Sequence, residues 1–358
     1  MLFRSGTGAV AARTALAHAA QHYASLHIAP SSARTYDVGA RAYAVFSVFF
    51  RPGRPAFPAS DEALQHFVTF QSQSCQYSTL KTYLYGVRDF QLARGMPFAP
   101  LAERLGLWWT LRGIRRSHGR PAQPKQALTF RILLDVWRAA TTGGRDQMET
   151  DTHVVFTAML VGMFGMLRKN NLTADKARAA HGDARIRRSD VTFREGRGLD
   201  GAQTTVMWIR IRSSKTNQYG ERVQHVPFVQ IGGALCPVSA VRRLLQRVPG
   251  GPEDPLFTVQ QRQRAQRVPL THATFVRRMK GLLQTAGHNP AAFAGHSLRR
   301  GGATMAFRLG VPRHLIKVHG DWLSDVVDHY NEMDPATRLH LPLRMAQHAA
   351  SLYALRLE

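Results

Sequence analysis

Acidic residues are scarce in this chain of 358 residues, which carries 23 Asp and Glu against 48 Lys and Arg. The formal net charge is +25, and the first 36 residues contain no acid at all. So large an excess of one sign repels itself in a compact fold and is typically retained for a polyanionic partner. Nucleic acid is the leading partner, because each phosphate that a cation neutralises releases condensed counterions. A GC-rich genome, which enriches Ala and Arg, is the alternative explanation for part of the excess.

Cysteines and long apolar runs are also few. Cys75 and Cys236 are the only cysteines and stand far apart, which excludes a disulfide framework and a thiolate metal site and suits a reducing compartment. The most apolar stretch, residues 154–166, is shorter than the roughly 18 residues needed to span a bilayer. The sequence also has no HExxH-type motif. We therefore expect no membrane span, no metal and no cofactor.

The N-terminal part of the chain predicts a group of helices from Ser31 to about Leu111. The clearest helix begins at Ser78. Its apolar side chains recur at the i, i+3, i+4 spacing of one helix face, at Leu80, Tyr83, Leu84, Val87 and Phe90. Lys81 and Arg88 lie off that face, where they would either contact phosphates or be solvated.

Two basic segments flank these helices. Residues 1–30 combine Arg4 and Arg13 with small and hydroxylated residues, which predicts a poorly ordered basic arm, with an organelle transit peptide as the alternative. Residues 111–126 (LRGIRRSHGRPAQPKQ) are basic, contain proline and lack acids. Within this stretch, residues 116–126 are the predicted linker between two domains.

Beyond this linker the sequence predicts helices and one β-hairpin. Residues 206–212 alternate between apolar and polar side chains, which is typical of a strand. A turn at 217–220 and a returning strand at 222–228 complete the hairpin. Helices are predicted on both sides of it, at residues 129–140, 151–166, 237–246, 271–286 and 297–309.

Six residues suited to phosphodiester cleavage follow one another in this second part. They are Arg168 in GMFGMLRKNNL, Lys215 in RSSKTNQYGERVQHVPF, His296 and Arg299 in GHSLRRGGAT, and Trp322 and Tyr330 in HGDWLSDVVDHY. Each is a weak signal alone, since an arginine at a helix end commonly binds the last carbonyls and HxxR arises often in a chain rich in Arg and His. Together, these residue types could break a phosphodiester without a metal, with cations holding the phosphate while a tyrosine hydroxyl attacks it.

This set resembles the tyrosine recombinase (phage-type integrase) family over residues from about 30 to 340. The runs LRKNNL, HSLRRGGAT and HGDW, with the KT-hairpin-VP strand pair, look most like recombinases of eukaryotic Crypton and DIRS-type mobile elements. The resemblance implies a mainly α fold with a small β-hairpin or sheet. It implies a helical, SAM-like core-binding domain at 31–115, a mixed α/β tyrosine recombinase catalytic domain at 127–345 and a tail at 346–358.

The resemblance also implies a role for each residue. Arg168 and Arg299 would direct their guanidinium forks at the non-bridging phosphate oxygens. Lys215 would protonate the leaving 5′ oxygen, and His296 would hydrogen-bond the phosphate. Tyr330 would be the nucleophile that forms a 3′-phosphotyrosyl bond, with neighbouring cations to activate its hydroxyl.

Two positions need comment. Asn171 stands where the family often has an acid, three residues after the first arginine; it can orient a guanidinium but supplies no charge. Trp322 stands eight residues before Tyr330 and fits the family members that use tryptophan, either to donate its indole N–H or to pack the site closed. His319 is the secondary candidate for that position.

The function implied by the resemblance is DNA strand exchange without metal or ATP. The partner would be double-stranded DNA, held in a two-domain clamp by a homotetramer on two duplexes, with a monomer in the absence of DNA and a nuclear location. Two alternatives remain open: a DNA-binding relic of a mobile element that no longer cuts, and a type IB topoisomerase-like enzyme. The candidate DNA-binding residues are basic and lie on the predicted helices and linker: Lys81, Arg88, Arg112, Arg115, Arg116, Arg120, Lys125 and Arg300.

Overall fold

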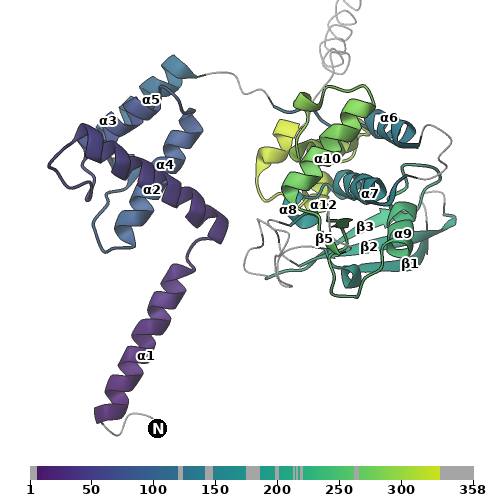
Figure 1. Cartoon of the computed structure of the whole chain (residues 1–358), viewed down its shortest axis with the longest axis horizontal. Helices are drawn as coiled ribbons and strands as arrows, with labels where there is room; N and C mark the ends of the chain where they lie inside the picture. The colour runs from purple at the N-terminus through teal and green to yellow at the C-terminus, as the bar shows by residue number, and fades with distance from the viewer. Residues whose placement is uncertain are drawn as a thin grey trace, which may run out of the picture. The chain divides into compact units, whose positions relative to one another are not determined.

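The chain forms two compact units, residues 1–123 and 124–358 (Figure 1). The computed structural model describes residues 6–119, 124–141, 148–174, 186–197, 201–212, 214, 217, 221–261 and 266–330, with the backbone alone for 6–9, 329 and 330. Each unit has its own buried apolar cluster, so each is described by itself.

The described residues of the N-terminal unit form helices and turns. The helices are α1 (Gly6–Ser25), α2 (Pro30–Phe50), α3 (Asp61–Gln71), α4 (Tyr77–Leu92), the 3₁₀ turn η1 (Leu101–Glu103) and α5 (Leu105–His118). Tyr43 of α2 and Phe67 of α3 are completely buried and meet edge to face, with ring centroids 5.3 Å apart. Helices α2 and α4 pack so closely that a Cβ on Gly39 or Gly86 would meet the backbone of the other helix.

Two sequence-based expectations for this unit are wrong. The predicted disordered arm is largely helical, because eight of the 20 residues of α1 are alanine, the best helix former. Residues 116–118, the first three residues of the predicted linker, form the last part of α5. Leu111 and Ile114 explain this helix, since both pack onto the apolar cluster of the unit.

The second unit combines a group of helices with a small sheet that lies at their edge (Figure 1). Its helices are α6 (Phe130–Thr141), α7 (Thr150–Phe164), α8 (Lys169–Leu172), α9 (Pro237–Arg247), α10 (His272–Thr285), α11 (His296–Arg308) and α12 (Arg313–His319), with 3₁₀ turns η2 (Arg188–Asp190), η3 (Pro290–Ala292) and η4 (Asp325–Tyr330). Its strands are β1 (Val191–Arg197), β2 (Gln203–Ile211), β3 (Gln224–Val229), β4 (Thr258–Gln260) and β5 (Arg267–Pro269).

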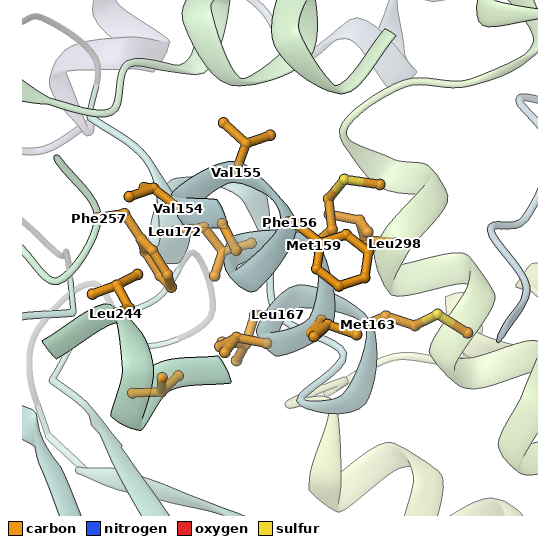
Figure 2. Close-up of a cluster of buried hydrophobic side chains, with 14 of the residues drawn as sticks. Val154, Val155, Phe156, Met159, Met163, Leu167, Leu172, Leu244, Phe257 and Leu298 are labelled. Carbon is orange, nitrogen blue, oxygen red and sulfur yellow. The ribbon is translucent and has the colours of Figure 1, made fainter. Parts of the chain in front are cut away.

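Helix α7 is the centre of this unit and contacts α6, α9, α10 and α11. Figure 2 shows Val154 and Met159 of α7 in the buried cluster, together with Leu244 of α9 and Leu298 of α11. Nearly every side chain of α7 is buried, which agrees with its almost continuous apolar sequence. Packing on all sides therefore holds α7 in place, and the candidate site lies just beyond its C-terminal end.

The main sheet is antiparallel, with strand order β1-β2-β3. Ile209 of β2 is opposite Val191 of β1 and Val226 of β3, so β2 is the central strand. The β2–β3 pairing confirms the predicted hairpin. Strand β1 was not predicted, because its sequence VTFREGR is mostly exposed and lacks a strong apolar alternation. A second, two-stranded sheet pairs β4 with β5.

These features confirm the predicted fold class, a mainly helical chain with small antiparallel sheets. No helix in the described part of the chain is long and apolar enough to cross a bilayer. Helix α11 crosses α7 in close contact, and a Cβ on Gly302 would lie 2.2 Å from the carbonyl oxygen of Met163. This close crossing brings the HSLRRGGAT motif against the end of α7.

Candidate active site

Arg168 lies in the turn that follows α7. Met166 in this turn has a left-handed backbone, with φ of 48°, and Arg168 is the N-cap of the short helix α8. The side-chain oxygen of Asn171 accepts a hydrogen bond from the backbone N–H of Arg168 (3.2 Å). Asn171 is buried, so its polar side chain needs such a partner. It therefore shapes the turn through the backbone of Arg168.

The guanidinium of Arg168 is held by one residue from the other end of the unit. Its Nη1 donates to Oδ2 of Asp321 (3.0 Å), and its Nη2 donates to the backbone oxygen of Asp321 (2.9 Å). Asp321 also has a left-handed backbone, with φ of 56°. Met166 and Asp321 are the two residues other than glycine with positive φ in the described part of the chain. Strained backbone of this kind is typical of functional sites.

Arg299 lies beside the same two segments. It is on the first turns of α11, is 4% exposed, and its Nη1 donates to the backbone oxygen of Met166. Its guanidinium carbon lies 3.7 Å from the ring centroid of Trp322, a cation–π contact. The pair Asp321–Trp322 therefore contacts both arginines, and the turn that carries Arg168 also bonds Arg299. The fold brings Arg168 and Arg299 to one place.

His296 is the first residue of α11 and is exposed. Because it stands three residues before Arg299, the two side chains are on the same side of the helix. The preceding Gly295 packs against the start of α8, since a Cβ added to this glycine would lie 3.6 Å from Cβ of Lys169. His296 is therefore solvent-accessible and follows a residue that packs on the segment that carries Arg168.

Trp322 and His319 have different surroundings. Trp322 is 8% exposed and packs in a small apolar cluster with Met166, Ile316 and Val327. The ring of His319 makes a 2.9 Å hydrogen bond with the backbone oxygen of Phe164, at the end of α7. The structure thus gives His319 a role in joining α12 to α7, while Trp322 is the residue that contacts an arginine of the candidate site.

Tyr330 is the last residue of η4, and its side chain lies outside the described residues. The turn that carries it is fixed by Val327, which is 1% exposed. Two cations of α12 also hold η4: Arg313 bonds Asp325 and Asp328, and Lys317 bonds Asp325 (3.0 Å). Hydrogen bonds from Lys317 and Arg313 lower the pKa of Asp325. The backbone leading to Tyr330 is therefore anchored to α12.

Lys215 lies outside the described residues, but its neighbours do not. The hydroxyl of Ser214 donates to Oδ2 of Asp321 (2.7 Å), and the guanidinium of Arg222 bonds Oδ1 of the same carboxylate. Both residues belong to the connection between β2 and β3. This connection therefore reaches the carboxylate that holds Arg168.

Sequence reasoning missed Asp321, Arg222 and Ser214. The available signal was the position of Asp321, directly before Trp322 in the HGDW run. An acid in a chain with so few acids, next to a candidate site residue, is a reasonable partner for an arginine. The link to Arg222 had no signal in the sequence, because about a hundred residues separate it from Asp321.

The candidate DNA-binding residues lie mostly on two helices of the N-terminal unit. Lys81 and Arg88 of α4 are exposed, as are the three arginines of α5. These three are Arg112, Arg115 and Arg116. The guanidinium carbon of Arg112 lies 4.5 Å from the ring centroid of Trp108, and that of Arg115 lies 5.5 Å from the ring centroid of Tyr77. In the second unit, Lys125 donates to the backbone oxygen of Ala291 (2.9 Å), and Arg300, next to Arg299, is half-buried. Arg120 lies outside the described residues.

An apolar cavity of about 590 Å³ lies between β3 and helices α11 and α12. Its lining includes Trp208, Pro227, Leu315 and Val318, which suit an apolar group and not a phosphate. In the described residues no group of three His, Cys, Asp or Glu is placed to hold a metal ion. The concentrated positive charge at Arg168, Arg299 and Arg222 suits an anion instead.

The sequence matches no protein-family model and no curated protein. The structure resembles XerH site-specific recombinase bound to palindromic difH substrate in a post-cleavage complex, with a TM-score of 0.58 at 15% identity over 90% of this chain and 79% of that chain. The pre-cleavage complex of XerH gives 0.55 at 14% over 89% and 79%. A lambda integrase tetramer bound to a Holliday junction gives 0.51 at 13% over 89% and 77%. The chain therefore has the two-domain fold of tyrosine recombinases and integrases.

Proposed function

We propose that this protein is a DNA strand-exchange enzyme that cuts and rejoins DNA through a 3′-phosphotyrosyl intermediate, without metal or ATP. One observation carries the proposal. Arg168 and Arg299, far apart in the sequence, are held together by Asp321 and Trp322, and the anchored turn η4 leads from these residues to Tyr330. In a chain whose fold is that of tyrosine recombinases, this is the arrangement that metal-free phosphodiester cleavage requires.

The proposed chemistry uses the cations in place of a metal ion. The guanidinium groups of Arg168 and Arg299 donate to the non-bridging oxygens, where negative charge increases in the transition state. The oxygen of Tyr330 attacks phosphorus as its proton passes to His296, and the bond from phosphorus to the 5′ oxygen breaks.

Two further groups complete the reaction. Lys215 gives its proton to the leaving 5′ oxygen, and His296 hydrogen-bonds the phosphate. The phosphotyrosyl bond conserves the energy of the broken linkage, so a 5′ hydroxyl from another strand reverses the reaction and releases Tyr330. Ring stacking by Trp322 keeps Arg299 in place.

The proposed partner is double-stranded DNA, bound by a tetramer on two duplexes. The net charge of +25 supports DNA as partner, and the tetramer is suggested by the lambda integrase complex on a Holliday junction. The motifs LRKNNL, HSLRRGGAT and HGDW support placement with the recombinases of Crypton and DIRS-type mobile elements. Purified protein with nicked duplexes should therefore form complexes that contain two DNA molecules.

The test is covalent capture of DNA. Wild-type protein is incubated with a library of short duplexes that have randomised sequence around a nick, so that cleavage releases a small fragment and traps the intermediate. We expect an SDS-resistant protein–DNA adduct with the wild type and none with Tyr330→Phe. Tyr85→Phe, which removes an exposed hydroxyl from α4, is the matched control and should form the adduct.

Two results would favour other functions, and a third would contradict the role of Tyr330. Salt-sensitive DNA binding with no adduct in the wild type would indicate a DNA-binding relic. Relaxation of supercoiled plasmid without transfer between duplexes would indicate a topoisomerase. A full yield of adduct from Tyr330→Phe would remove this tyrosine from its proposed role.

A further inference from the structure

Asp321 is the most highly connected acid of the candidate site. Its side chain is 8% exposed, and its carboxylate accepts bonds from the side chains of Arg168, Ser214 and Arg222. Its backbone oxygen accepts a further bond from Arg168. Charge-assisted bonds of this kind are roughly twice as strong as bonds between neutral groups, so this residue is a firm point of attachment for its partners.

The two hydrogen bonds that Arg168 donates to Asp321 fix the orientation of its guanidinium, which one bond would not do. Side-chain and backbone oxygens of the same residue receive Nη1 and Nη2 of one guanidinium, at 3.0 and 2.9 Å. Two contacts to a planar fork determine both its position and its plane. A guanidinium has five N–H donors, so a group held by Asp321 can also donate to a phosphate.

The left-handed backbone at Asp321 explains why an aspartate can occupy this position. At φ of 56°, most side chains with a Cβ are strained, and Asp and Asn are the residues other than glycine that adopt this conformation most readily. The same turn places Trp322 against Arg299. Two adjacent residues therefore contact both arginines.

The charge on Asp321 also has a reason. Arg168, Arg222 and Arg299 are grouped at this end of the unit, and Asn171, at the position three residues after Arg168, is neutral. Like charges repel strongly in a partly buried site, so the group needs a carboxylate to be stable before DNA arrives. Asp321 supplies that carboxylate from a distant part of the sequence.

We propose that Asp321 is a positioning residue for cleavage, which holds the guanidinium of Arg168 in the orientation that receives the scissile phosphate. This inference rests on the proposed function and adds a residue to it. Asp321 itself does not contact the reacting atoms. Its effect is therefore expected on the rate of adduct formation and not on the affinity for DNA.

The test compares Asp321→Asn and Asp321→Glu with the wild type on a nicked duplex selected from the library. Asn keeps the size and the left-handed preference of the residue but removes its charge, whereas Glu keeps the charge. The control is Asp37→Asn, which removes a carboxylate that is 58% exposed and pairs with Arg41 on α2 of the N-terminal unit. Single-turnover adduct formation, the Kd for DNA and the thermal unfolding midpoint are measured for each protein.

We expect Asp321→Asn to form the adduct about tenfold or more slowly than the wild type, with a Kd within about threefold, because a misoriented donor loses part of its transition-state contact. Asp321→Glu should be faster than Asp321→Asn, and Asp37→Asn should match the wild type in its rate of adduct formation. A rate for Asp321→Asn equal to that of the wild type would overturn the inference. A rate above that of the wild type would also overturn it, by showing that the carboxylate restrains Arg168. Equal, slow rates for Asn and Glu would overturn it by showing that the shape of the turn, and not the charge, is needed. Absence of an adduct in the wild type would instead remove the proposed function itself.

Discussion

At the scale of single residues, Arg299 depends on its packing as much as on its charge. Its guanidinium is buried, bonded to the backbone of Met166 and stacked on the ring of Trp322. Both contacts limit the orientations that this planar group can adopt. A donor held in this way needs little reorganisation when a phosphate binds.

Replacement of Trp322 tests whether stacking or hydrogen bonding is its main contribution. Trp322→Phe keeps an aromatic face under Arg299 and should retain adduct formation within about tenfold of the wild type. Trp322→Ala removes that face and leaves a cavity beside Met166, so we expect a loss of about a hundredfold. Single-turnover adduct assays measure both. If the Phe variant is as slow as the Ala variant, the indole N–H is the important group.

A buried histidine on α7 provides a second prediction at this scale. Burial, with Arg247 and Arg243 nearby, lowers the pKa of His153 to about 4. Between pH 6.5 and about 4 the unfolded chain binds a proton here and the folded chain does not, so the free energy of unfolding falls as the pH is lowered through this window. At pH 5 the free energy of unfolding is therefore about 2 kcal/mol lower, because of His153, than at a pH well above 6.5.

Denaturant unfolding at pH 7.5 and pH 5 checks this value. His153→Gln removes the titrating group. From pH 7.5 to pH 5, its free energy of unfolding should therefore fall by about 2 kcal/mol less than that of the wild type. Its stability at pH 7.5 is the internal reference for any cost of the substitution itself. An identical pH dependence in both proteins would show that His153 titrates normally.

The site residues differ in how far sequence could predict them. Arg168 and Arg299 stand in recognisable runs of residues, and the structure brings them together. Asp321 was not predicted, since its role depends on a left-handed turn and on contacts to residues far away in the sequence. The roles of Lys215 and Tyr330 stay predictions, because their side chains lie outside the described residues.

At the scale of elements, the crossing of α11 with its neighbours depends on glycine. A Cβ on Gly301 would lie 2.0 Å from the carbonyl oxygen of Leu128, a distance that requires the backbone to move. This segment also bonds α11 directly, because the backbone N–H of Leu128 donates to the oxygen of Ser297 (3.0 Å). The glycines of HSLRRGGAT thus permit the packing that places Arg299.

Gly301→Ala should therefore destabilise the protein by about 2 kcal/mol or more, although alanine is the better helix former. Gly281→Ala is the matched control, since Gly281 lies on α10 with no atom near its Cβ position and should gain about 0.5–1 kcal/mol. Urea unfolding of both variants measures the difference. A gain in stability for Gly301→Ala would contradict the close crossing.

Elements with a strong apolar period were predictable, and those without it were not. Helix α4 shows the i, i+3, i+4 pattern that its buried face requires. Helix α1 lacks such a face and owes its structure to alanine, so composition suggested a disordered arm. Strand β1 is defined by its pairing with β2, a contact between separate segments that local sequence does not express.

At the scale of the whole molecule, the charge excess predicts the mode of DNA binding. The exposed cations of α4 and α5 are available to phosphates, and each phosphate contact contributes about 0.9 to the slope of log Kd against log salt concentration. Replacing Lys81 and Arg88 together by alanine should reduce this slope by about 2. Fluorescence anisotropy with a labelled duplex at several salt concentrations measures it.

Arg41→Ala is the control for this experiment. Arg41 is also exposed on the N-terminal unit, but it pairs with Asp37 at 2.7 Å. Its replacement should leave the slope near that of the wild type. A slope unchanged in the Lys81 and Arg88 double variant would exclude these residues from the DNA interface.

Identification of the residue that becomes attached to DNA tests the central claim most directly. Trypsin cuts after Lys317 and Arg338, so residues 318–338 form one peptide with a single tyrosine, Tyr330. Mass spectrometry of the digested, nuclease-trimmed adduct should find a nucleotide attached to this tyrosine through a 3′ phosphate. Attachment at any other residue, or a DNA-bound protein that carries no nucleotide after denaturation, would contradict the account.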